Sequence, residues 1–255
     1  MPSAKEQLGV AQAQRDGRRI DSLAKKHASA TAAVWDTQLQ EALNHIFLVL
    51  HNNKGRGDKV AARPDVVYAI NSAVEAAVEQ SMDRLDAGWN TGSLLGNAMA
   101  RRQARMMGLP QPSTFQPDAG LLASFKGDME NLAKAVTEDL DKAIRSEDDE
   151  TIKKAVSGAV LRSRMAGEAS AKYGAQNALG GALEGTGGLR KRWVTTSPLP
   201  CSHCIALAAL GPILWSSEFP HSFPGLRELK VYGGSLLGPP RHPNCACVLV
   251  AVKEK

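Results

Sequence analysis

The four cysteines of this 255-residue chain all lie in its last quarter, where they form two close pairs. Cys201 and Cys204 make a Cys-x-x-Cys pair, and Cys245 and Cys247 follow much later, just after His242. Two short turns that each present soft ligands are typical of a site in which one zinc ion joins both turns. The spacing therefore predicts that one metal ion holds two distant segments together.

Five donors compete for the four positions of a tetrahedral zinc ion. We favour Cys201, Cys204, Cys245 and Cys247 as the ligands, and the alternative is that His242 replaces one of the last two. In an extended strand, Cys245 and Cys247 would share one face, because side chains alternate along a strand. The set is complete without an open position, so we expect a closed structural site with one Zn2+ per chain rather than a catalytic centre.

The cysteines could instead form two disulfides, remain as four buried free thiols, or make a redox Cys-x-x-Cys. The redox alternative requires a βαβ context, whereas the preceding sequence is helical in pattern. We expect His203 to lie behind the ligands or at the surface, and His221 not to be a ligand. The polar N-terminus is unlike a secretory signal, so we expect assembly in a reducing cytoplasm, where clustered cysteines more often bind metal than form disulfides.

The residues before the cysteines favour helices, because the chain is rich in Ala and only 5% aromatic. Residues 3–51 predict one long helix or two end to end, with an exposed or partner-bound first half that is a candidate docking arm. A helix that opens at Pro64 is expected to end near Gly88, and a shorter basic helix follows over 94–107. The clearest helical periodicity is that of Leu122, Phe125, Met129, Leu132, Val136, Leu140 and Ile144.

The C-terminal sequence changes character after the glycine-rich stretch 180–188. Strands are expected at 193–196 and 247–252 and a short helix at 205–210, separated by loops rich in Gly, Pro and Ser. We therefore predict two domains, residues 1–188 and 189–255. The fold class is mainly α, with an elongated helical N-terminal region followed by a small zinc-stapled α+β C-terminal module, which has too little apolar material to be stable alone.

The net charge of +5 belongs to the C-terminal segment. Residues 189–255 contain eight Lys and Arg against three acidic residues, and the rest of the chain is balanced. Such a surface could face nucleic acid or an acidic protein, although a solvated surface is the commoner meaning. No apolar run is long enough to span a bilayer. The sequence contains no GxSxG, HExxH or Walker motif that would indicate an enzyme.

Three C-terminal motifs carry a family resemblance: Trp193-Val194-Thr195-Thr196, Cys201-x-x-Cys204, and Pro239-Pro240-x-His242-Pro243-Asn244-Cys245-x-Cys247. Together they resemble the phage Mu protein F-like minor head proteins over about residues 162–250. Ala246 stands where that family usually has Arg.

The resemblance implies a structural minor capsid, or head morphogenesis, protein of a tailed bacteriophage rather than an enzyme. Such a protein would be assembled in the host cytoplasm and would lie in several copies inside the phage head at the portal vertex. Its expected partners are the portal protein, the major capsid protein and packaged DNA, the last through the basic C-terminal module, with a role in packaging or ejection. The alternatives are a capsid maturation protease and a zinc-dependent nucleic-acid-binding protein.

Overall fold

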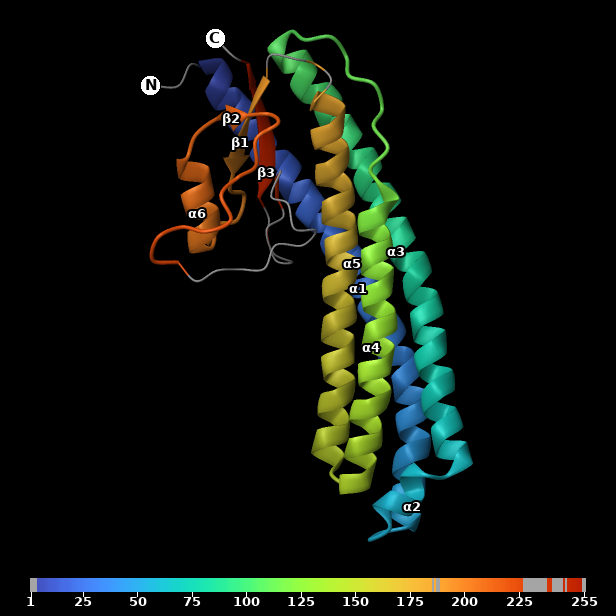
Figure 1. Ribbon diagram of the computed structural model, residues 1–255. Coiled ribbons are helices and arrows are strands. Elements are labelled where there is room, and N and C mark those ends of the chain that lie inside the picture. Colours follow the sequence, from blue (N-terminus) through green and yellow to red (C-terminus); the bar gives the residue numbers. More distant parts are fainter. Residues whose placement is uncertain are drawn as a thin grey trace. The chain divides into compact units, whose positions relative to one another are not determined.

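The computed structural model describes residues 4–184, 186, 189–226, 238–239, 245 and 247–253. It is 73% helical, with a small antiparallel sheet near the C-terminus, which confirms the predicted fold class (Figure 1). The helices are α1 (Ala4–Asn52), α2 (Gly57–Ala61), α3 (Pro64–Met107), α4 (Ala119–Ser146), α5 (Asp149–Glu184) and α6 (Ser202–Ala209), and the strands are β1 (Leu189–Val194), β2 (Ile213–Leu214) and β3 (Val248–Lys253). Within these residues, no helix has both the length and the hydropathy that a membrane crossing requires.

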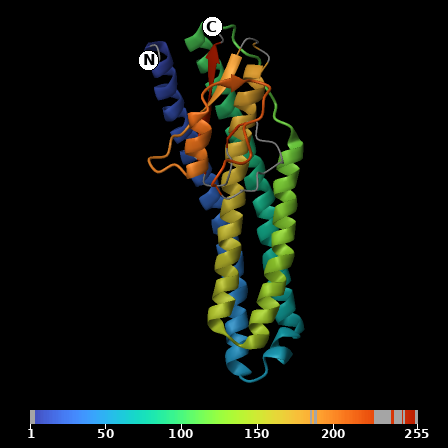
Figure 2. The same cartoon turned by 60° about the vertical axis from the view of Figure 1, so that its left-hand side comes forward.

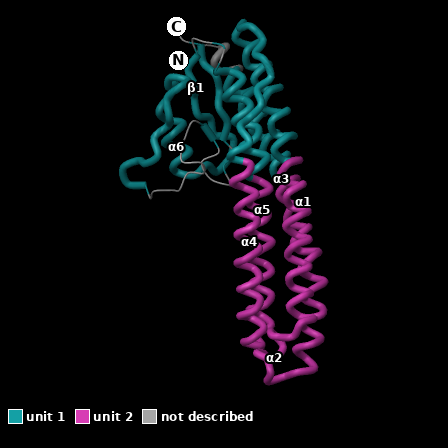
Figure 3. The backbone as a smooth tube through the Cα atoms, turned by 45° about the vertical axis from the view of Figure 1, so that its right-hand side comes forward, with its two compact units in different colours: residues 1–25, 88–121, 169–255 teal, residues 26–87, 122–168 magenta. Residues whose placement is uncertain are grey.

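The chain divides into two compact units (Figure 3). Unit 1 consists of residues 1–25, 88–121 and 169–255, and unit 2 consists of residues 26–87 and 122–168. The C-terminal sheet therefore belongs to the same unit as parts of α1, α3 and α5. A domain division at residue 188 stays a prediction.

Unit 2 is a bundle of four helical segments with the short α2. Side chains join neighbouring segments: the Trp35 indole of α1 donates a hydrogen bond of 2.9 Å to Ser81 of α3, and Lys126 of α4 lies 2.8 Å from Asp86 of α3. The predicted stripe of α4 is confirmed from Phe125 onward, and only Leu122 at its start is partly exposed. The buried residues of α4 are Phe125, Met129, Leu132, Val136, Leu140, Ala143 and Ile144.

One face of the first half of α1 belongs to the core of unit 1, so the prediction that this half is an unpacked docking arm, exposed or bound only by a partner, is wrong. Ala13 and Ile20 are buried in the same apolar cluster as β1 and β3. Gly17 lets the helix approach closely, because a Cβ at this position would collide with the side chain of Thr196. Small side chains, which look featureless in the sequence, are what this tight packing requires.

The α3 helix continues through Gly88, where the sequence predicted its end. Its glycines serve helix packing rather than termination. A Cβ at Gly92 would overlap the carbonyl oxygen of Ala171, and one at Gly96 would overlap that of Ala175. The backbones of α3 and α5 therefore approach each other at a distance that only glycine permits.

The sheet has the order β2-β1-β3, and both pairings are antiparallel. Val194 pairs with Val248 at one end of the β1–β3 ladder and Leu189 with Lys253 at the other. The sequence predicted β3 over nearly its whole length, but the strand predicted at 193–196 overlaps β1 only at Trp193 and Val194. It did not predict β2, which is only two residues long. Leu207 of α6 and Trp193 of β1 lie in one buried cluster, and α6 lies beside the sheet in two views (Figures 1 and 2).

Two glutamine side chains cover the outer edge of β3. Gln103 of α3 donates to the Leu249 carbonyl at 3.2 Å and accepts from the Ala251 N–H at 2.9 Å. Gln176 of α5 donates to the Cys247 carbonyl at 3.3 Å. These amides satisfy backbone groups that an open strand edge would otherwise leave unpaired.

A lysine lies inside unit 1. Lys191 of β1 is 2% exposed, and its Nζ lies 5.5 Å from the centre of the Phe219 ring. Burial lowers the pKa of Lys191 to about 8, although the charges of Glu184 and Glu218 act in the opposite direction. The free-energy cost of removing the charged ammonium from water is larger than the electrostatic stabilisation that these carboxylates provide.

This buried lysine predicts a stability that rises with pH. Between the folded pKa of about 8 and the unfolded value of 10.5, the unfolded chain holds more protons, so alkali favours folding. The free energy of unfolding should increase by up to roughly 3 kcal/mol across this window in the wild type. Urea denaturation at pH 7.5 and pH 10 should show that Lys191→Met removes this contribution, whereas Lys253→Met at an exposed position does not. Equal pH dependence of the two variants would contradict the assignment.

Candidate metal centre

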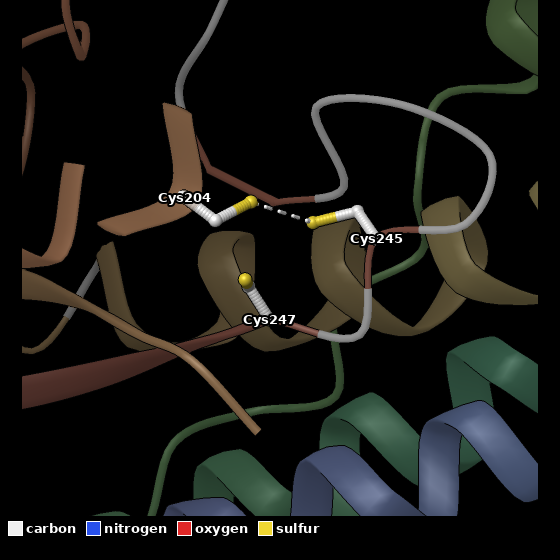
Figure 4. Close-up of side chains that lie close together, drawn as sticks. All are labelled: Cys204, Cys245 and Cys247. Carbon is white, nitrogen blue, oxygen red and sulfur yellow. Dashed lines mark hydrogen bonds between the residues drawn. The ribbon is translucent and has the colours of Figure 1, made fainter. Parts of the chain in front are cut away.

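Three cysteine sulfurs converge in unit 1. The Sγ atoms of Cys204, Cys245 and Cys247 lie within 4.8 Å of one another. The Cys204 and Cys245 sulfurs are 3.7 Å apart and point toward each other, with Cys247 beside them (Figure 4). All three residues are buried, with exposures of 2%, 2% and 6%. The predicted convergence of the two cysteine pairs is confirmed for these three thiols.

The topology of the sheet brings the thiols together. Val194, the last residue of β1, pairs with Val248, the first residue of β3. The chain that leaves β1 turns through Pro198 and Pro200 into α6, which carries Cys204, and the chain that enters β3 carries Cys245 and Cys247. One end of the β1–β3 ladder therefore holds both cysteine pairs.

Cys201 begins α6. Its backbone is extended, with φ −68° and ψ 158°, and its Sγ accepts the N–H of Cys204 at 3.4 Å. A side chain is an N-cap when it accepts a hydrogen bond from the backbone N–H of a residue two or three positions later. Here a sulfur atom takes the place of the usual oxygen. This contact fixes the Cys-x-x-Cys turn and aims Cys204 at the other two thiols.

Without a metal, the thiols of Cys204 and Cys247 hold their protons, because the pKa of each is raised. Hydrogen bonds with Cys245 and Cys247, and then burial, raise the pKa of Cys204 well above its ordinary value. A hydrogen bond with Cys204 lowers the pKa of Cys247, but Cys245 and burial outweigh it, and the net pKa is raised. Three negative charges cannot share this buried space without a cation. A divalent metal would supply the compensation and would displace the protons as it bound.

One group beside the thiols, the indole of Trp193, favours a negative charge at Cys247. The Trp193 indole Nε1 is buried and has no acceptor among the described residues, and the same indole acts to lower the pKa of Cys247. A thiolate at Cys247 would accept this N–H. A narrow pocket beside Cys245 and Cys247 is also lined by Lys172 and Asp21, whose charged atoms are 3.2 Å apart.

The remaining candidate residues have different surroundings. Cys201 is half-buried and is not among the three clustered thiols, whereas His242 lies outside the described residues. His203 is buried on α6, and His221 lies 3.3 Å from Glu218 near the surface. Among the described residues, the structure therefore brings three of the five candidate ligands together.

Sequence reasoning missed the residues on the helical side of the site. Lys172 and Gln176 are one turn apart on α5 and line the pocket beside the thiols. The sequence does contain a pattern that could have indicated them. Two polar residues four positions apart in an alanine-rich helix lie on one face, where they can line a common site.

The donor set defines the chemistry. All four cysteines are free thiols, so the disulfide alternative does not describe this structure. Three soft sulfur donors in a buried site suit a thiophilic metal, a class that includes Zn2+, Cu+ and iron–sulfur clusters. The three thiols are close enough to hold a metal ion. Comparison with known proteins gave no match to a protein-family model, a curated protein or a solved structure.

Proposed function

We propose that this chain is a structural minor capsid, or head morphogenesis, protein of a tailed bacteriophage, and that one zinc ion fastens its C-terminal segment. The observation that carries the proposal is the convergence of Cys204, Cys245 and Cys247. These cysteines belong to the same two motifs that resemble the Mu protein F-like family. A shared metal gives those motifs a physical reason to occur together in one chain.

The zinc has a structural role in this proposal. Three thiolates and one further ligand close the coordination shell and leave no position for water or substrate. Cys201 is the favoured fourth ligand, because its sulfur already belongs to the turn that presents Cys204. His242 is the alternative, in place of Cys201 or of one of the clustered cysteines.

The proposed location is the portal vertex inside the phage head, with the portal protein as the main partner and the major capsid protein as a further one. Several copies per particle are expected, assembled with the head in the host cytoplasm. Support for this location comes from the motif resemblance.

The test is mass spectrometry of particles purified from the phage that encodes the chain, after chemical cross-linking. The protein should be present in several copies per head, uncleaved and cross-linked to the portal protein. Absence from both proheads and mature heads would refute the proposal. So would head proteins that remain uncleaved after a single Ser→Ala or Cys→Ala change in this chain, since that result indicates a maturation protease.

A further inference from the structure

Charge is distributed unequally between the two compact units. Unit 1 contains 17 Lys and Arg and eight Asp and Glu, a formal net charge of +9. Unit 2 contains 14 Lys and Arg and 18 Asp and Glu, a net charge of −4. Unit 1 is therefore more positively charged than the total of +5 indicates, and electrostatic attraction to a polyanion is expected for unit 1 rather than for unit 2.

Within unit 1, residues 4–25 of α1 contain five Lys and Arg against three Asp and Glu. Asp16 is fully buried and pairs with Arg102 of α3. Asp21 pairs with Lys172 of α5 at 3.2 Å and with Lys25 at 2.7 Å. Asp16 is thus paired with a cation of another helix, and Asp21 with one of another helix and one of α1 itself. Among the described residues, neither acid is paired with an arginine of α1.

Three arginines and one serine of α1 form one exposed stripe, which consists of Arg15, Arg18, Arg19 and Ser22. Their spacing of three and four residues places them on one face of the helix. All four side chains are exposed, and none of the three arginines has an ion pair in the part of the chain that the structure describes. Exposed, unpaired guanidinium groups in a line are well suited to contact successive phosphates.

We propose that this stripe on α1 binds the phosphate backbone of double-stranded nucleic acid. The stripe contains no aromatic residue on which an unpaired base could stack, which favours a duplex over a single strand. It also contains no large apolar side chain, whereas protein interfaces depend on buried aromatic and aliphatic anchors. Binding by this stripe depends neither on the metal centre nor on the phage assignment, and the stripe lies outside the C-terminal segment.

The experiment measures binding of a fluorescein-labelled duplex DNA of arbitrary sequence by anisotropy, at salt concentrations from about 50 to 200 mM. The variant replaces Arg15, Arg18 and Arg19 with alanine, which keeps the helix because alanine is a strong helix former. Affinity should fall about tenfold or more at the lowest salt concentration. Each lost phosphate contact lowers the slope of log affinity against log salt by about 0.9, so the slope should decrease by nearly three.

The matched control removes three exposed lysines of unit 2, Lys134, Lys142 and Lys154, which changes the net charge equally. This control should bind DNA as the wild type does. Circular dichroism establishes that both variants keep their helices. Equal loss in both variants, wild-type binding by the arginine variant, or no DNA binding by the wild type would each overturn the proposal. Tighter binding to poly-glutamate than to DNA would instead indicate an acidic protein as the partner and would also overturn it.

Discussion

Cys204→Ser and Cys245→Ser are each expected to abolish tight zinc binding. A serine hydroxyl is a poor ligand for zinc, so each change removes one of the three clustered donors. Structural zinc sites contribute about 10–16 kcal/mol of apparent binding free energy in small zinc domains, so loss of a thiolate should lower affinity by orders of magnitude. Competition with a chromophoric chelator gives the affinity, and elemental analysis should find one zinc per wild-type chain.

The same variants should loosen the C-terminal segment while the helices persist. Protease cleavage should begin between residues 195 and 253, and far-ultraviolet dichroism should change little because the fold is 73% helical. Ser202→Ala is the matched control, since it alters an exposed side chain within the same turn. A Cys204→Ser protein that retains wild-type zinc affinity would show that the thiol cluster is not a metal site.

The fourth ligand can be identified with cobalt as a spectroscopic substitute for zinc. Cys201→Ala should weaken the sulfur-to-cobalt charge-transfer absorption and lower affinity, whereas His242→Ala should leave both unchanged. The reverse result would assign the fourth position to His242. Proton release on metal binding should accompany either result, because the pKa values of Cys204 and Cys247 are raised in the metal-free protein.

The double change Gly92→Ala and Gly96→Ala is expected to destabilise the protein strongly. Helix propensity alone predicts the opposite sign, since alanine in place of a helical glycine stabilises by about 1 kcal/mol. In this fold, each new Cβ would overlap a carbonyl oxygen of α5, at Ala171 or Ala175. Overpacking costs about 1–3 kcal/mol per site, and backbone atoms cannot move aside as a flexible side chain can. The midpoint of urea denaturation should fall accordingly.

Gly180→Ala provides the control for this prediction. Gly180 lies in α5, and a Cβ there would have no atom within 4 Å. The substitution should therefore raise stability slightly, following propensity alone. A double variant at 92 and 96 that is as stable as the wild type would mean that α3 and α5 do not approach each other closely enough for the new Cβ atoms to collide.

Local patterns predicted the features that depend on local chemistry. The three- and four-residue spacing of α4 indicated its buried face, the apolar run at the C-terminus indicated β3, and the paired cysteines indicated one shared site. Each of these signals involves side chains close in sequence or a ligand type that a metal requires. The end of a helix at Gly88 was predicted on the same kind of local reasoning, and it was wrong because the glycines of α3 serve contact with α5.

Residue types and their spacing were enough to predict a mainly helical chain with a short α+β segment and a cysteine pattern suited to one metal ion. Contacts between distant segments could be recognised only in the fold: one face of the first half of α1 is core, Gln103 and Gln176 cover the edge of β3, and Asp16 and Asp21 pair with cations of other helices. The physical reason is that these features depend on which distant segments meet. A residue type limits the contacts it can make, but the partner at the other end of each contact is set by the packing of the whole unit.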